Sequence, residues 1–252
     1  HRPTAVVGTK LLREIKLEED PDRQLRMRHF FTEKLARGGS PTMDRVPMLF
    51  NNDVALWMAF PDKEDDFYYR NAQADEIIYV SDGSGTLETA FGELTYSQGD
   101  YLVIPRGILH RYRLGKDKQR FFITESKGEV RTPKRYRNEY GQLIERSPFS
   151  ERDWRVPENL QAVDKKEPAV IVVKQRDLLT EVTLDHHPCD VVGWDGYYYP
   201  YAFSIHDFEP IVGRYHEPPP VHQTFQGDNF VVCSFCPRPY DFGEDAVPAP
   251  YN

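Results

Sequence analysis

The sequence predicts an all-β protein, built as a sandwich or a barrel. From residue 47 to residue 124, short apolar runs alternate with polar residues, and Gly, Pro and Asn interrupt them roughly every 8 to 12 residues. Short strands at this spacing are typical of sandwiches and barrels. No apolar run reaches the roughly 18 residues that a membrane helix needs, so no membrane span is expected.

One short helix is expected near the N-terminus, in the charged stretch 20–36. Asp20-Pro21-Asp22 places proline in the first helical turn, where its missing N–H costs nothing, and Gly38-Gly39 follow the stretch. The rest of the N-terminal region is expected to be strands and turns.

Two hairpins follow this helix. Residues 48–50 and 54–60 flank the turn Asn51-Asn52-Asp53, and residues 86–90 and 94–96 flank a turn that contains Gly92. Further strands are expected in three apolar runs, at residues 101–104, 108–114 and 121–124.

Residues 127–168 change in character, because they are rich in Arg, Glu, Tyr and Pro and have weak periodicity. We interpret them as an ordered connecting arm, since its aromatic residues need a surface to pack on. These residues are Tyr136, Tyr140, Phe149 and Trp154. Strand patterns resume at residues 169–174, 181–184 and 230–235. The chain is therefore divided into a first barrel within residues 1–150, and the arm with the first part of an incomplete second barrel within residues 151–252.

The first barrel carries a pattern that resembles the cupin motif. Asp75-Glu76 opens the apolar run 77–80, and a later Gly99-Asp100 leads through residues 101–104 to His110. The cupin motif has two metal-binding histidines where this chain has Tyr69 and Asn71. Only Glu76 and His110 remain, which is fewer than the three protein ligands of most metal sites. The first barrel is therefore predicted to hold no metal.

Charge and cysteine content limit the possible partners and compartments. The net charge is −8, which argues against nucleic acid as a partner. Basic residues gather within residues 127–146, which fits a solvated face or a subunit contact better than a phosphate site. The three cysteines do not form a disulfide framework, and no secretory leader is recognisable, so a cytoplasmic location is predicted.

The second half contains the residues best suited to chemistry. His216 and His222 flank the segment 217–221, in which three consecutive prolines restrict the backbone and can hold both imidazoles in place. The pair could bind a transition metal together with Glu217, or one imidazole could act as a general base. The alternatives are hydrogen-bonded structural histidines and, for the tyrosine run 197–201, a packing wall.

Taken in order, several segments resemble the homogentisate 1,2-dioxygenase family in a compact bacterial form. The segments that carry this resemblance are residues 2–7, the first barrel, 191–196, 199–201, the His216 loop, 235–238 and 247–252. No single segment would suffice, but their order and spacing along the chain support the resemblance.

The resemblance implies an all-β double cupin of two jelly-roll barrels, the second incomplete in this chain, and a non-haem Fe(II) enzyme. Such an enzyme opens the ring of homogentisate with O2 to give maleylacetoacetate, in tyrosine and phenylalanine catabolism. It implies that His216 accepts the substrate's phenol proton, that His222, Tyr197 and Tyr199 line the substrate pocket, and that the protein is a trimer or hexamer. It also implies that the iron ligands lie beyond Asn252, so that the chain alone binds no metal and is a fragment of the enzyme.

Two other readings stay open. The loss of two histidines from the first barrel fits a non-catalytic bicupin that binds or stores a small molecule. A cupin sugar isomerase would need histidines at Tyr69 and Asn71, and this chain lacks them.

Overall fold

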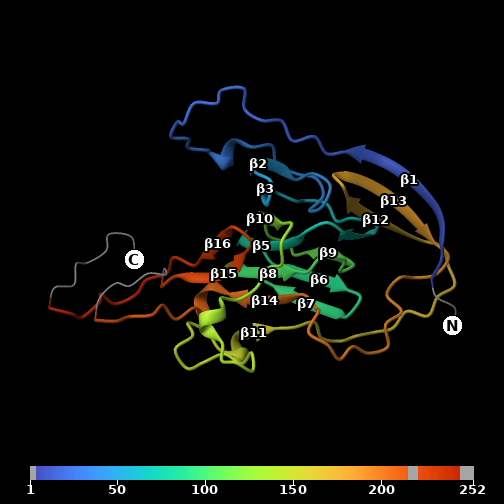
Figure 1. Ribbon diagram of the computed structural model, residues 1–252. Helices are drawn as coiled ribbons and strands as arrows, with labels where there is room; N and C mark the ends of the chain where they lie inside the picture. Colours follow the sequence, from blue (N-terminus) through green and yellow to red (C-terminus); the bar gives the residue numbers. More distant parts are fainter. Residues whose placement is uncertain (1–3, 215–220, 245–252) are drawn as a thin grey trace.

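The computed structural model describes residues 4–214 and 221–244, and in this part of the chain strands form almost all of the regular structure (Figure 1). The first sheet contains, in spatial order, β1 (Val6–Glu14), β13 (Leu178–Leu184), β12 (Ala169–Gln175), β4 (Tyr68–Asn71), β9 (His110–Leu114), β6 (Gly85–Thr89) and β7 (Gly92–Tyr96). The second contains β11 (Trp154–Arg155), β14 (Tyr201–Ser204), β8 (Asp100–Ile104), β5 (Asp75–Asp82), β10 (Arg120–Ser126), β3 (Val54–Ala59) and β2 (Val46–Phe50). A separate hairpin pairs β15 (Gln223–Gly227) with β16 (Phe230–Cys233).

The two large sheets enclose an apolar core, and we call this unit the first barrel. Alternate residues of β5, β8 and β10 face this core, including Ile78, Leu102 and Phe121, which are fully buried. Tyr112 and Leu87 meet them from the first sheet. The predicted all-β cupin fold is thus confirmed.

Strands from beyond residue 151 complete both sheets of the first barrel. β14 pairs with β8, and β12 lies parallel to β4 with Lys174 opposite Asn71. The β12–β13 hairpin turns at Arg176 and Asp177, which both have positive φ. The second half of the chain therefore supplies side chains to the first barrel. The division of the chain near residue 150 remains a prediction.

The connecting arm covers the outer face of the second sheet with aromatic side chains. Phe149 and Trp154 contact Phe203 of β14, with the Trp154 and Phe203 ring centroids 5.1 Å apart. Tyr136 is buried in the same cluster, as expected, but Tyr140 is largely exposed and anchors nothing. Three short 3-10 turns, η2 (Lys134–Tyr136), η3 (Glu151–Asp153) and η4 (Ile205–Asp207), shape the chain around this cluster.

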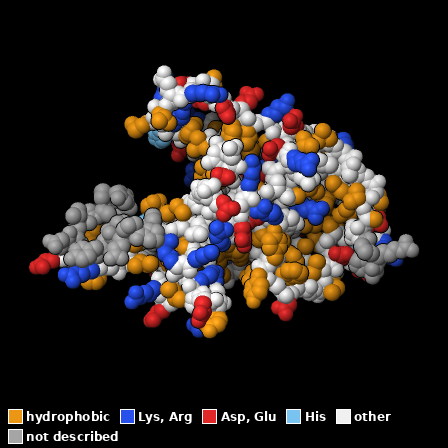
Figure 2. Space-filling model, viewed as in Figure 1, with side chains coloured by type: hydrophobic (Ala, Val, Ile, Leu, Met, Phe, Trp, Pro, Cys, Tyr) orange, Lys and Arg blue, Asp and Glu red, His pale blue; other side chains and the backbone are white. Residues whose placement is uncertain are grey.

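The predicted N-terminal helix is wrong. Residues 20–36 are irregular except for a single 3-10 turn, η1 (Thr32–Lys34), and the segment projects from the body of the protein (Figures 1 and 2). Leu25 and Met27 are fully exposed. Because these side chains pack against little of the protein, a helix here would lack tertiary support, and short helices without tertiary packing are marginal in water.

The two predicted hairpins are present as β2–β3 and β6–β7. Asn51 accepts backbone N–H bonds from Asp53 and Val54, which closes the first turn as the sequence indicates. Within the described ranges, no helix combines the length and apolar character needed to cross a bilayer.

Candidate functional site in the first barrel

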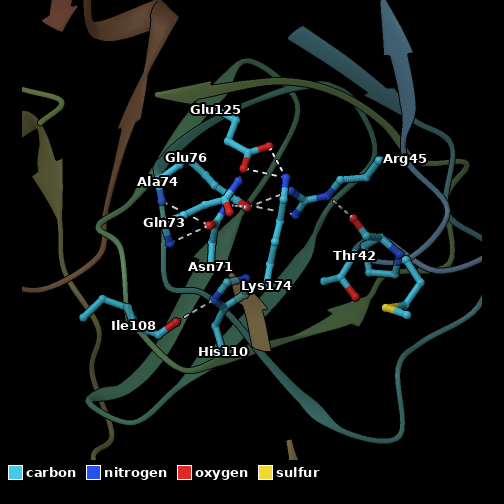
Figure 3. A network of polar contacts seen from close by, with 12 residues as sticks. Thr42, Arg45, Asn71, Gln73, Ala74, Glu76, Ile108, His110, Glu125 and Lys174 are labelled. Atoms are coloured by element: carbon cyan, nitrogen blue, oxygen red, sulfur yellow. Dashed lines mark hydrogen bonds and ion pairs between the residues drawn. The ribbon is translucent and has the colours of Figure 1, made fainter. Parts of the chain in front are cut away.

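Glu76 lies at the centre of a buried polar network inside the first barrel (Figure 3). It is the second residue of β5 and stands directly opposite Glu125 of β10. Both carboxylates are buried and face the barrel interior. Like charges facing each other across two strands destabilise a sheet unless cations neutralise them, so this pair requires partners.

Arg45 supplies the first cation. Its two terminal nitrogens donate to the two oxygens of Glu76 over 2.8 and 2.9 Å, and its Nε donates to the Pro41 carbonyl. Burial alone would raise the pKa of Glu76, but the Arg45 charge and hydrogen bonds outweigh burial and lower it. For the same reason the attraction of Glu76 raises the pKa of Arg45 despite its burial. The pair therefore stays ionised.

Lys174 of β12 supplies the second cation. Its ammonium contacts both oxygens of Glu125 at 2.6 Å and lies 4.9 Å above the Trp57 ring. Asn71 links the two ion pairs, because its amide nitrogen donates to Glu76 over 3.0 Å and to Glu125 over 2.8 Å. Asn71 thus stands where the cupin motif has a histidine, and here it joins two salt bridges.

His110 is completely buried beside this network. Its Nδ1 lies 3.1 Å from the Ile108 carbonyl, so Nδ1 carries the proton and Nε2 is left as an acceptor without a donor among the described residues. Burial lowers the pKa of His110 to about 4, and the Glu76 charge only partly opposes this. The imidazole is therefore neutral at pH 7.

Two buried phenols contact His110 edge-on, with ring centroids 5.5 Å away for Tyr69 and 5.7 Å away for Tyr112. Burial raises the pKa of both phenols above the usual value. None of these groups has a pKa near 7, where a general acid or base works best. The arrangement suits binding better than proton transfer.

The donors present in the first barrel do not fit an Fe(II) ion. His110 has the tautomer of a metal ligand, since its Nδ1–H is fixed by a carbonyl. However, both oxygens of Glu76 accept hydrogen bonds from Arg45. The positive charge of Arg45 would repel a metal cation bound to Glu76. One imidazole nitrogen is too few for a site that usually has three protein ligands. Within residues 4–214 and 221–244, no group of three or more His, Cys, Asp or Glu side chains is placed to hold a metal.

The structure places the residues predicted for the substrate site in different segments. His222 precedes β15 and is buried, with its ring centroid 5.0 Å from that of Phe235. Tyr197 is fully exposed and Tyr199 is half-buried, both in the irregular segment before β14. His216 lies outside the described residues. These four assignments remain predictions.

The sequence analysis did not identify three members of the network, Arg45, Glu125 and Lys174. A weak signal was available for two of them, because Glu125 and Lys174 each continue a strongly apolar run, as the last residue but one of β10 and of β12. The sequence around Arg45 gave no sign of burial, because Arg45 lies in an irregular segment just before β2.

Comparison with known proteins identifies relatives for this chain. The sequence profile of the family described as "Homogentisate 1,2-dioxygenase N-terminal" matches residues 48–205. A protein of Saccharolobus solfataricus named "Putative dioxygenase" is 40% identical over 250 residues, which cover 99% of this chain and 64% of the relative. The homogentisate 1,2-dioxygenase of Bradyrhizobium diazoefficiens is 31% identical over 165 residues, which cover 62% of this chain and 34% of the relative. The chain thus spans less than two thirds of the length of either relative.

Solved structures with similar folds include two cupins. A cupin-2 domain protein of Shewanella frigidimarina gives a TM-score of 0.30 at 20% identity, covering 33% of this chain and 80% of its own. A cupin protein of Bacteroides fragilis gives a TM-score of 0.31 at 15% identity, covering 40% of this chain and 86% of its own.

Proposed function

The chain belongs to the homogentisate 1,2-dioxygenase family, in the part that the N-terminal profile covers, and we propose that it forms the metal-free barrel of a ring-opening dioxygenase. The proposed reaction joins homogentisate and O2 to give maleylacetoacetate in tyrosine and phenylalanine catabolism. The observation that carries the proposal is the buried Arg45–Glu76 pair. This pair supports a structural role for the first barrel, with the oxygen chemistry in another part of the complete protein.

Fe(II) is the proposed cofactor of the complete protein, with ligands outside the first barrel. When bound, Fe(II) would supply the site at which O2 reacts with the aromatic substrate. For this chain we propose that His216 accepts the proton of a substrate phenol, and that His222 and Tyr199 line the same pocket. Tyr197 is proposed for the rim of this pocket, because its side chain is fully exposed.

Oxygen uptake and product formation test the activity. The product of the complete gene, loaded with Fe(II), is expected to consume one O2 per homogentisate and to form the ring-opened diacid, which mass spectrometry identifies. The variant His216→Gln should lower kcat/KM by roughly 10²- to 10⁴-fold, the usual contribution of a general base. The matched control is His206→Gln, which changes an exposed histidine of η4 and should leave kcat/KM unaltered.

Metal analysis tests the metal-free barrel separately from activity. The variant His110→Gln removes a buried imidazole nitrogen that has no donor among the described residues, yet the iron content per chain should stay the same as in the unaltered protein. A stoichiometric loss of iron in this variant would place the metal in the first barrel and refute the proposal.

The alternative is a non-catalytic bicupin that binds or stores a small molecule. The same Arg45–Glu76 pair favours it, because a barrel without metal ligands can still enclose a ligand. Saturable binding of homogentisate without any O2 consumption by the Fe(II)-loaded complete protein would favour this alternative.

We also propose that the protein is a homo-oligomer, a trimer or a hexamer. Support comes from β1, which forms an edge of the first sheet and exposes about 60% of Val6, Val7 and Leu11. An exposed apolar edge strand is a common site of association. Light scattering on the complete protein measures the mass, and a monomer at micromolar concentration would contradict this proposal.

A further inference from the structure

A cavity of about 230 Å³ lies against the polar network of the first barrel. Its lining includes Arg45 and Lys174 of the network and the aromatic rings of Trp57 and Tyr69. A second cavity of about 270 Å³ shares Ile15, Trp57 and Lys174 with it. Cavities of this size can hold a small organic molecule.

The charges around the first cavity favour an anion. Four cations line it, Arg13, Lys16, Arg45 and Lys174, against the single carboxylate of Glu14. Glu76 and Glu125 neutralise the two buried cations, and Lys16 lies 3.7 Å from Glu14. The Arg13 guanidinium donates to the Met43 carbonyl and has no carboxylate partner among the described residues. Arg13 therefore contributes a positive charge to the cavity that no carboxylate of the described residues pairs with directly.

Hydrogen-bond donors without acceptors point to the same conclusion. The indole Nε1 of Trp57 is buried, and among the described residues it has no acceptor. An indole N–H can only donate, and a buried donor without a partner is costly. Arg45 uses three of its five N–H groups, on Pro41 and Glu76, which leaves one on each terminal nitrogen.

Part of the cavity lining is aromatic and aliphatic. Trp57 and Tyr69 are almost completely buried, and Ile15 and Leu179 add aliphatic surface. Offset or edge-on contact with such rings favours an aromatic ligand. We propose that the first barrel binds a small aromatic carboxylate, whose ring packs against Trp57 and Tyr69 and whose carboxylate accepts from Trp57 Nε1 and faces Arg13 and Arg45.

The site is independent of the proposed dioxygenase activity, and its test uses binding alone. Benzoate is the probe and benzamide its neutral control of nearly the same shape. Calorimetric titration of the complete protein, treated with a chelator to remove metal, should show saturable binding of benzoate. Benzamide should bind at least about tenfold more weakly, as the loss of a charged hydrogen bond implies.

Two variants locate the binding. Trp57→Phe keeps an aromatic ring but removes the N–H, and it should weaken benzoate binding about tenfold. Its matched control, Trp194→Phe, changes an exposed tryptophan away from the cavity and should bind benzoate like the unaltered protein. Arg13→Gln, at an exposed position of β1, should weaken benzoate binding and leave benzamide binding unchanged. If Trp57→Phe fails to fold, the benzoate affinity of Arg13→Gln tests the proposal.

Three results would overturn the proposal. They are the absence of saturable benzoate binding to the metal-free protein, equal affinities for benzoate and benzamide, and unchanged benzoate affinity in folded Trp57→Phe or in Arg13→Gln.

Discussion

The inner and outer faces of the second sheet are stabilised by different kinds of contact. On the inner face, β5 and β10 carry Glu76 and Glu125, and two cations and one amide satisfy them with short hydrogen bonds. On the outer face, β8 and β14 carry Tyr101 and Phe203, whose rings stack on each other, and Phe203 packs against Trp154 of the connecting arm. Hydrogen bonds and ion pairs require one particular partner in one geometry. The stability gained from packed aromatic rings depends mainly on the volume and shape of the side chains.

This difference has a consequence for tolerance to substitution. Removing one member of a buried ion pair leaves an unpaired charge, which costs more than the pair itself contributes. Replacing one buried ring by another large apolar side chain leaves most of the buried area in place. The inner face should therefore be more sensitive to a single conservative change than the outer face.

The largest effect is expected for Lys174→Met, which keeps the length of the side chain but leaves Glu125 buried without its cation. The free energy of unfolding should fall by about 3 to 5 kcal/mol, measured by urea denaturation at pH 7. Adding Glu125→Gln should restore most of the loss, because the double variant contains no unpaired charge. Lys16→Met, at an exposed position, is the control and should change stability by less than about 0.5 kcal/mol. A single variant as stable as the double variant would contradict the importance of this ion pair.

The next effect concerns pH and depends on His110. Its pKa is about 4 in the folded protein and about 6.5 in the unfolded chain, so between these values the unfolded chain binds the extra proton. Stability from this residue is complete above about pH 6.5 and is lost as the pH falls toward 4, by about 3 kcal/mol in all.

The variant His110→Gln should flatten the stability profile between pH 7 and pH 4. His206→Gln, at an exposed position, should retain the slope of the unaltered protein. If His110→Gln lost stability with the same slope, another group would have to account for it.

A smaller effect is expected on the outer face. Phe203→Leu keeps an apolar side chain in the aromatic cluster, and the free energy of unfolding should fall by about 1.5 kcal/mol. The exposed Phe242 gives the control, since Phe242→Leu should leave stability unaltered. A loss as large as that of Lys174→Met would show that the outer face is as specific as the inner face.

The smallest effect is expected in the projecting N-terminal segment. Leu25→Ser and Met27→Ser change fully exposed side chains and should alter the free energy of unfolding by less than about 0.5 kcal/mol. A larger loss that depends on protein concentration would indicate that a second copy covers this segment, which would support the proposed oligomer.

The elements that the sequence predicted well have local causes. The Asn51–Asp53 turn closes through bonds within four residues, and alternation along β7 follows from the pleat of a single strand. The prediction of a helix at residues 20–36 is wrong because local signals are not enough for a helix. Its helix-start signal is also local, but a helix persists in water mainly through tertiary packing that this segment lacks.

The sequence by itself determined the all-β fold and the absence of histidines at positions 69 and 71, because strand periodicity and residue identity are both local properties. Only the tertiary structure decided what stands in their place. Arg45 reaches Glu76 across 31 residues, and Lys174 reaches Glu125 across 49. Which charges meet in a buried interior depends on how distant strands align, and a residue pattern along one strand carries no information about that alignment.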